Sequence, residues 1–248
     1  MTVHPAPRQF LRHCLAATRR FSRIPVTGSL AHWADLQPEL DAASGRHWPG
    51  VGLVIGMAAC MVFALVSLPL PHTAFTPLVA AVVSTGAGVL LTGGQHEQAL
   101  QRQAGPPGLV LVLAAKLALL ALLGLQSPAG VLAALLAGHA VSRLGGVVLA
   151  ASLPQAGGRD EHPAFPARVG RPEVLVAAAW CALPLTLMAL AEGVPFLLLP
   201  LATSAVALAW LRTHLRARQK GFTNDALGFV QQVCEVAFYL GAGFGVGR

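Results

Sequence analysis

A polar stretch, TGGQHEQALQRQAG (Thr92–Gly105), separates two long apolar runs and contains the most chemically suggestive residues in the first half of the chain. His96 and Glu97 lie side by side within it, and no further acidic residue follows before the next apolar run. Polar segments next to hydrophobic scaffolds often carry catalytic or binding groups. Three interpretations stay open at this point: an active-site loop, the remains of one, or a plain connector.

Ionisable residues also occur inside the apolar runs, namely Lys116, His139, Arg143 and Glu235. A charged side chain within a bilayer is costly unless it is paired or hydrated, so each of these residues is a functional candidate. His139 and Arg143 are four residues apart and therefore share one helix face. The structural alternatives are an ion pair between helices or, for Arg143, a side chain that extends to the membrane interface.

Composition defines the elements that must position these residues. Of the 248 residues, 55% are hydrophobic and 11% are charged, and the mean hydropathy is +0.64. Soluble domains carry about 25% charged residues, so the chain is predicted to be an all-α integral membrane protein. The net charge of +7 comes mainly from arginine clusters, which in membrane proteins usually mark the cytoplasmic connections. The positive charge therefore does not require that the protein binds nucleic acid. The cysteines and histidines lack the spacings of metal sites.

Seven apolar runs are long enough to cross a bilayer as helices, which takes about 20 residues each. They are Val51–Leu70, Ala74–Thr92, Gly108–Leu125, Gly130–Leu153, Glu173–Ala191, Val194–Leu211 and Ala226–Val246. Arginines and lysines occupy alternate connections, whereas the connections near Pro71, Ser127 and Glu192 have none. The positive-inside rule then predicts a polytopic bundle of about seven spans with a cytoplasmic N-terminus.

The sequence predicts a cytoplasmic segment at residues 1–50 and a single transmembrane domain at residues 51–248. In the first segment, Phe10, Cys14 and Phe21 can share a face of an amphipathic helix on the membrane surface, although an ordinary tail is the alternative. In the second, polar loops at 93–107 and 219–228 are expected on the cytoplasmic side. Because the inner end of the fourth span is polar too, a site is expected at that end of the bundle.

Five short segments, spread in order along nearly the whole chain, resemble the motifs of one enzyme family. They are RRFSRIPVTG (Arg19–Gly28), HWPGVGLVIG (His47–Gly56), TGGQHE (Thr92–Glu97), AGHAVSR (Ala137–Arg143) and QKGFTNDALGFVQQVCEVAFYLG (Gln219–Gly241). Each segment alone is weakly specific, but five of them in this order are specific. The family is that of the cobalamin-5′-phosphate synthases, also called adenosylcobinamide-GDP ribazoletransferases.

The resemblance implies a multi-pass enzyme of the bacterial inner membrane. Such an enzyme joins adenosylcobinamide-GDP to α-ribazole or its 5′-phosphate, releases GMP, and depends on Mg²⁺. For this chain it implies a catalytic group of Asp225, Glu97 and His96, in which Asp225 and Glu97 bind the metal. The substrate-binding residues that it implies are His139, Ser142, Arg143, Lys116, Thr223 and Gly221. The planar fork of donors in arginine is well suited to phosphate.

The acidic motif of the family, H-E-D-G-x-A-D-x-x-D-G, is poorly matched in this chain. Placed without gaps, Gln98, Arg102 and Gly105 stand where the family has aspartates, and with a gap the acidic segment is absent. Asp225 and Glu97 together can hold one weakly bound Mg²⁺ that keeps several waters. In the competing interpretation, Glu97 is a solvated loop residue and Asp225 caps the last helix.

Three functions follow from these observations. The first is the ribazoletransferase of late cobalamin biosynthesis, and the second is a catalytically impaired homologue that keeps the scaffold. The third is a transporter, which intramembrane charges permit but which more often shows internal repeats and a site at the midplane. The expected partners are the two substrates and membrane lipid, with a second copy of the chain or other pathway enzymes as further partners, and no nucleic acid.

Overall fold

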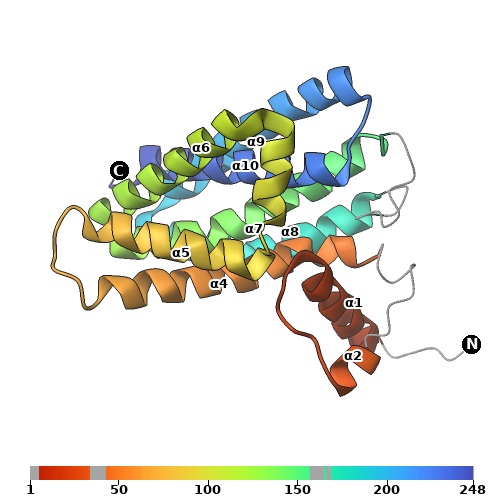
Figure 1. Ribbon diagram of the computed structural model, residues 1–248, viewed down its shortest axis with the longest axis horizontal. Coiled ribbons are helices and arrows are strands. Elements are labelled where there is room, and N and C mark those ends of the chain that lie inside the picture. The colour runs from red at the N-terminus through yellow and green to blue at the C-terminus, as the bar shows by residue number, and fades with distance from the viewer. Residues whose placement is uncertain (1–5, 34–42, 157–164, 166–168, 248) are drawn as a thin grey trace, which may run out of the picture.

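The protein is a bundle of long helices with two N-terminal helices near one end (Figure 1). The computed structural model describes residues 6–33, 43–156, 165 and 169–247. The N-terminal part contains α1 (Ala6–Phe21), α2 (Ser29–Trp33) and a single 3-10 turn, η1 (Gly45–His47). The bundle consists of α4 (Trp48–Ser67), α5 (Thr76–Thr92), α6 (Gln95–Gln126), α7 (Pro128–Ser152), α8 (Arg171–Glu192), α9 (Val194–Gln219) and α10 (Asn224–Gly245).

Six of these helices, all but α5 in the bundle, are long and apolar enough to cross a membrane, and α5 is a shorter apolar helix of 17 residues. The chain is therefore a multi-pass membrane protein, as its composition predicts. In α7 and α10, respectively 72% and 67% of the apolar window is buried inside the protein, against 17% to 39% in the other four. Because their neighbours surround them, α7 and α10 form the core, and the remaining helices leave leucine and valine side chains exposed on the outside.

Close approach of α4 to α7 depends on two small residues one turn apart, Gly52 and Gly56. A Cβ atom on Gly52 would collide with the carbonyl oxygen of His139, and one on Gly56 would lie 3.2 Å from the Cα of Leu136. Small residues at this spacing let membrane helices pack with their backbones in near contact. This packing holds the polar part of α7 against the centre of the bundle.

The polar stretch after α5 is mostly helical, which differs from the loop predicted at 93–107. Only Gly93 and Gly94 lie between α5 and α6, and α6 begins at Gln95. Apart from His96, residues 95–104 are glutamine, glutamate, alanine, leucine and arginine, all of which favour helices. The other expected loop, 219–228, is also shorter, because α9 continues to Gln219 and α10 begins at Asn224.

A kink divides α6 into a short first segment and a long membrane segment. Gly105 has φ 71° and ψ 174°, a conformation that side-chain-bearing residues rarely adopt, and Pro106 and Pro107 follow it. The first segment consequently runs steeply across the end of the bundle, whereas the remainder runs along it (Figure 1). The kink therefore places the polar residues 95–104 over one end of the bundle.

Candidate active site

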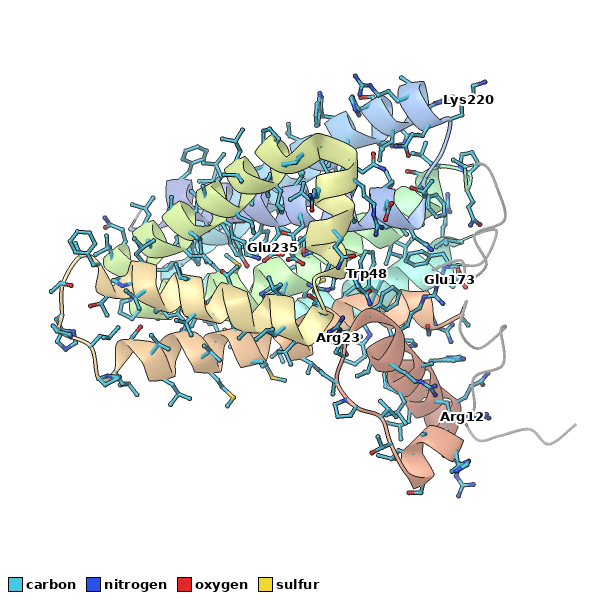
Figure 2. All side chains as sticks on the ribbon, viewed as in Figure 1. Arg12, Arg23, Trp48, Glu173, Lys220 and Glu235 are labelled. Carbon is cyan, nitrogen blue, oxygen red and sulfur yellow. The ribbon has the colours of Figure 1, made fainter. Side chains whose placement is uncertain are left out.

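A buried polar cluster surrounds Glu235 in the middle of the bundle (Figure 2). Its Oε1 lies 2.7 Å from Nζ of Lys116 and 3.4 Å from Nδ1 of His139, and it accepts a hydrogen bond of 2.9 Å from the Tyr239 hydroxyl. Gln231 donates to the other oxygen over 2.5 Å. Glu235 is fully buried, so these partners replace the water that the carboxylate would otherwise need.

Lys116 and Glu235 thus form an ion pair between α6 and α10, which is the structural alternative considered from the sequence. Arg143, in contrast, does not extend to the interface, because it is only 1% exposed. It donates 2.7 Å to the carbonyl oxygen of His139 on its own helix, and its Nε has no partner among the described residues. Ser142 lies beside it and accepts a hydrogen bond from Gln231.

Glu97 projects from the first segment of α6 toward α10 and is partly buried. Its Oε1 accepts a hydrogen bond of 2.7 Å from Gln232, and its buried Oε2 has no partner within the part of the chain that is described. It is therefore not the solvated loop residue of the competing interpretation. Glu97 lines the narrow polar gap above the Glu235 cluster together with Lys116, His139 and Arg143.

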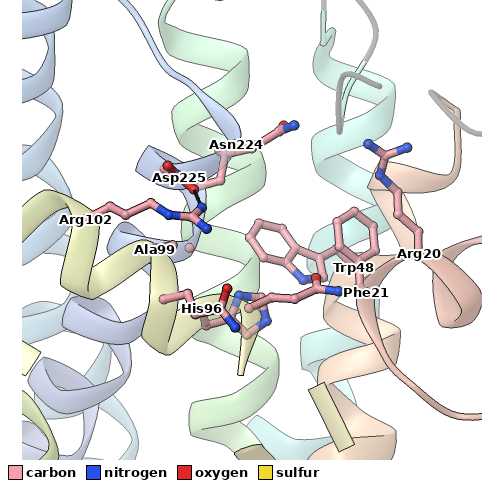
Figure 3. Close-up of a pocket in the computed structure, with 12 residues that line it drawn as sticks. Arg20, Phe21, Trp48, His96, Ala99, Arg102, Asn224 and Asp225 are labelled. Atoms are coloured by element: carbon pink, nitrogen blue, oxygen red, sulfur yellow. Dashed lines mark hydrogen bonds and ion pairs between the residues drawn. The ribbon is translucent and has the colours of Figure 1, made fainter. Parts of the chain in front are cut away.

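A separate, larger cavity of about 360 Å³ opens at the end of the bundle (Figure 3). Side chains from α1, α4, the first segment of α6 and the start of α10 meet there. The twelve residues that line it are Arg20, Phe21, Trp48, Gln95, His96, Gln98, Ala99, Arg102, Asn224, Asp225, Leu227 and Gly228. We call this cavity the end pocket.

Arg102 and Asp225 face each other across the end pocket, with 2.8 Å between Nη1 and Oδ1. His96 lies deeper, with its ring centroid 5.9 Å from that of Trp48. His96 lines both the end pocket and the polar gap beneath it, and its Nε2 is buried without a partner among the described residues. His96 therefore connects the pocket to the buried polar cluster.

Thr223 and Gly221 serve the connection between α9 and α10 rather than the end pocket. The Thr223 hydroxyl accepts a hydrogen bond of 3.1 Å from the amide of Ala226, so Thr223, and not Asp225, caps α10. A Cβ atom on Gly221 would collide with the carbonyl oxygen of Pro154. Thr223 does line a shallow cavity beside the end pocket, which shares Arg102 and Asp225 with it.

The residues present do not fit the Mg²⁺ site that the family resemblance implies. Mg²⁺ takes near-octahedral oxygen ligands, usually one or two carboxylates together with water and substrate phosphates. Among the described residues, no three or more His, Cys, Asp or Glu side chains lie close enough together to hold a metal ion. Asp225 is engaged by Arg102, and Glu97 is engaged by Gln232 below the pocket.

Four residues of the site escape the sequence prediction: Arg20, Trp48, Arg102 and Gln232. Arg20 and Trp48 do lie in two of the five recognised segments, so the motifs carry a signal for them. Gln232 belongs to the Gln-Gln pair of the last segment, where the sequence indicates only that polar residues interrupt an apolar helix. Arg102 stands where the family has an aspartate, and the sequence does not reveal its partner Asp225, which lies 123 positions away.

The fold and the site define a polytopic helical membrane protein with a positively charged pocket at one end of its bundle. The profile of the family described as Cobalamin-5-phosphate synthase matches residues 13–101 and 103–243. The chain belongs to this family, which confirms the resemblance found in its sequence. No solved structure matches the chain.

Curated relatives agree with this assignment. A protein of Polaromonas sp. strain JS666, named adenosylcobinamide-GDP ribazoletransferase, is 40% identical over 272 positions, covering 94% of this chain and 96% of its own. Proteins of the same name from Polaromonas naphthalenivorans and Albidiferax ferrireducens are 41% and 35% identical, with 94% and 96% of this chain covered and 98% and 99% of their own. The first alignment is longer than the 248-residue chain, so that relative has residues within it that lack a counterpart here.

Proposed function

We propose that this chain joins adenosylcobinamide-GDP to α-ribazole or its 5′-phosphate and releases GMP. One observation carries the proposal: four of the five family segments, distant in sequence, contribute residues to the end pocket. They supply Arg20, Trp48, His96 and Asp225, and the fifth segment supplies Arg143 to the polar cluster below. This convergence is the arrangement expected if the segments bind one substrate together.

The reaction requires recognition of a pyrophosphate, which two cationic side chains at the pocket favour. Arg20 and Arg102 line the cavity, and guanidinium groups form charge-assisted, often bidentate, hydrogen bonds with phosphate. A cavity of about 360 Å³ lies at the lower end of the range for small-ligand sites. It suits the nucleotide portion of the substrate and excludes the much larger corrin ring, which we place outside the pocket.

In the transfer step, the ribazole hydroxyl oxygen forms a bond to the phosphorus that carries cobinamide. The bond from that phosphorus to the oxygen of the GMP phosphate breaks, and GMP leaves. The hydroxyl proton needs an acceptor, and we assign this role to His96, whose Nε2 has no partner among the described residues. Asp225 holds Arg102 in place, and Glu97 holds Gln232 below the pocket.

The cellular setting belongs to the same proposal. The arginine-rich connections support an inner-membrane protein with a cytoplasmic N-terminus and the end pocket on the cytoplasmic side. Exposed leucine and valine side chains on α4, α5 and α8 support contact with lipid. Dependence on Mg²⁺ is implied by the family resemblance alone.

The test is GMP release from adenosylcobinamide-GDP and α-ribazole in membranes that contain the chain, against membranes that lack it. His96→Gln should lower the rate by about 10²–10⁴-fold, the usual contribution of a general base. His72→Gln, a matched histidine change between α4 and α5, should leave the rate unchanged. No release above empty membranes would reject the function, and an unchanged rate in His96→Gln would reject the role of His96.

A catalytically impaired homologue is the second candidate, and a specific observation favours it. The carboxylates are few, Asp225 is tied to Arg102, and the family match is interrupted at residue 102. Such a chain would still bind adenosylcobinamide-GDP but release no GMP. Binding of that substrate to the purified chain, measured by calorimetry alongside turnover, separates the two functions.

A further inference from the structure

The contact between Arg102 and Asp225 lies where the kink of α6 brings that helix over the start of α10. Nη1 of Arg102 and Oδ1 of Asp225 are 2.8 Å apart, and the two side chains are 61% and 36% exposed. Both residues line the end pocket and the shallow cavity beside it. A ligand that enters the pocket therefore meets this ion pair at its mouth (Figure 3).

The charges around the end pocket favour an anion over a second cation. Among its twelve lining residues, Arg20 and Arg102 are cationic, and Asp225 is the one carboxylate. A divalent cation at Asp225 would have to approach a guanidinium already within hydrogen-bond distance of the same carboxylate. Water moderates the repulsion between the two cations, because Arg102 and Asp225 are 61% and 36% exposed, but the guanidinium already engages an oxygen of the one carboxylate in the pocket. The donor set and the charge therefore both disfavour a metal.

Unused hydrogen-bond donors at the same pocket match an oxygen-rich anion. Arginine has five N–H donors, and the contact with Asp225 engages one guanidinium nitrogen of Arg102. Trp48 lines the pocket, and its Nε1 is buried without a partner among the described residues. Indole nitrogen can only donate, but this one has almost no exposed surface, so the match to an anion rests on the guanidinium donors of Arg102 that Asp225 does not engage.

We infer that Arg102 is the fixed cation of this pocket: it holds Asp225, binds the substrate's pyrophosphate directly, and leaves the pocket without a divalent-metal site of its own. The choice of pyrophosphate rests on the proposed function. The exclusion of the metal rests on the donor set and charges alone. In this arrangement the guanidinium of Arg102 neutralises negative charge on the pyrophosphate, as a bound metal ion would otherwise do.

Metal binding is tested first, by Mn²⁺ titration of the purified full chain in detergent with electron paramagnetic resonance as the readout. The wild-type chain should show no saturable Mn²⁺ binding with a Kd below about 1 mM, the value taken here as the limit of weak binding. Arg102→Asp removes the cation and adds a carboxylate opposite Asp225, so Mn²⁺ binding should appear. Arg216→Asp, a matched change at an exposed position outside the pocket, should not create it.

Anion binding is tested second, with methylenediphosphonate, a stable pyrophosphate analogue, in the presence of EDTA. The wild-type chain should bind it without metal, and Arg102→Gln should weaken binding by about tenfold or more, the usual effect of losing one charge-assisted contact. Arg216→Gln is the matched control. Thermal unfolding of each variant shows that it is folded, which is expected because Arg102 is largely exposed.

Saturable Mn²⁺ binding by the wild-type chain that Asp225→Asn abolishes would overturn the inference. So would analogue binding that appears only when a divalent metal is added, or that Arg102→Gln leaves unchanged. Neither readout involves turnover, so failure of the proposed function is distinguishable. A chain that releases no GMP but binds the analogue through Arg102 without metal would reject the function and support the inference.

Discussion

At the scale of single residues, the most consequential contact is the buried pair of Lys116 and Glu235. Glu235 has no exposed surface and the lysine side chain is 5% exposed, so neither can exchange its partner for water. Removal of one member of such a pair leaves an uncompensated buried charge. Substitution of either residue therefore tests how strongly the polar cluster holds α6 to α10.

Glu235→Ala should destabilise the protein by about 3–5 kcal/mol, because Lys116 and the nearby Arg143 lose their common counter-charge. The measurement is thermal unfolding of the detergent-solubilised chain, monitored through the loss of its monodisperse peak on size exclusion. Lys116→Met in the same chain should recover much of the loss, since the lysine no longer needs a partner. A double variant as unstable as Glu235→Ala would show that Lys116 is not the residue left unpaired.

At the scale of elements, the kink in α6 depends on the backbone of Gly105. Gly105→Ala should destabilise the protein by about 1–3 kcal/mol, the usual strain of a side chain in this region of φ and ψ. It should also weaken the Arg102 contact with Asp225, which lies just before the kink. The readouts are thermal unfolding and methylenediphosphonate binding. Gly86→Ala on α5, where an added Cβ meets nothing within 4 Å, is the control and should neither destabilise the protein nor weaken binding, because alanine favours a helix more than glycine does.

The docking of α1 should depend on pH through His13. Burial lowers the pKa of His13 from its ordinary value of 6.5, and Arg46 and Arg12 lower it further. His13 Nδ1 lies 2.7 Å from Nη2 of Arg46, and the ring of His47 is close by. The docked state thus prefers neutral histidine, so its stability is fully present above pH 6.5 and is lost progressively as pH falls below it.

Limited proteolysis at arginines in α1 measures this dependence. Cleavage should be slow at pH 7.5 and faster near pH 5.5, values that bracket the ordinary histidine pKa. His13→Gln should weaken the pH response, whereas the exposed His32→Gln should retain it. A response that is equal in both variants would assign the effect to a group other than His13.

Sequence alone predicts the elements of this fold better than the contacts between them. Hydropathy locates all seven bundle helices, because each is a long apolar run that packs either against lipid or against the other helices, although α5 is shorter than the other six. It misjudges residues 95–104, because a polar amphipathic helix lying across a bundle end has the composition of a loop. The pairing of Arg102 with Asp225 depends on a kink and on two helices meeting, which a single sequence does not reveal.

At the scale of the whole molecule, the outer helices should behave as lipid-facing surfaces. Met61 on α4 is 64% exposed, and a charge there would contact hydrocarbon rather than water. Met61→Lys should make the apparent free energy of membrane insertion less favourable by about 2.5–3.5 kcal/mol. The measurement is the carbonate-resistant fraction of the expressed chain. Thr213→Lys, near the arginine-rich end of α9, should leave that fraction unchanged, and equal loss in both variants would argue against α4 facing lipid.

The partnership of Lys116 with Glu235 also constrains how the protein is made. The ribosome completes α6 more than a hundred residues before it completes α10. Until then, the lysine of α6 has no counter-charge, and its helix enters the membrane at a disadvantage of about 2.5–3.5 kcal/mol. The arrival of α10 removes that disadvantage. Assembly of the membrane domain is therefore completed only after α10 is synthesised, and a chain that stops before α10 leaves Lys116 without its counter-charge in the membrane.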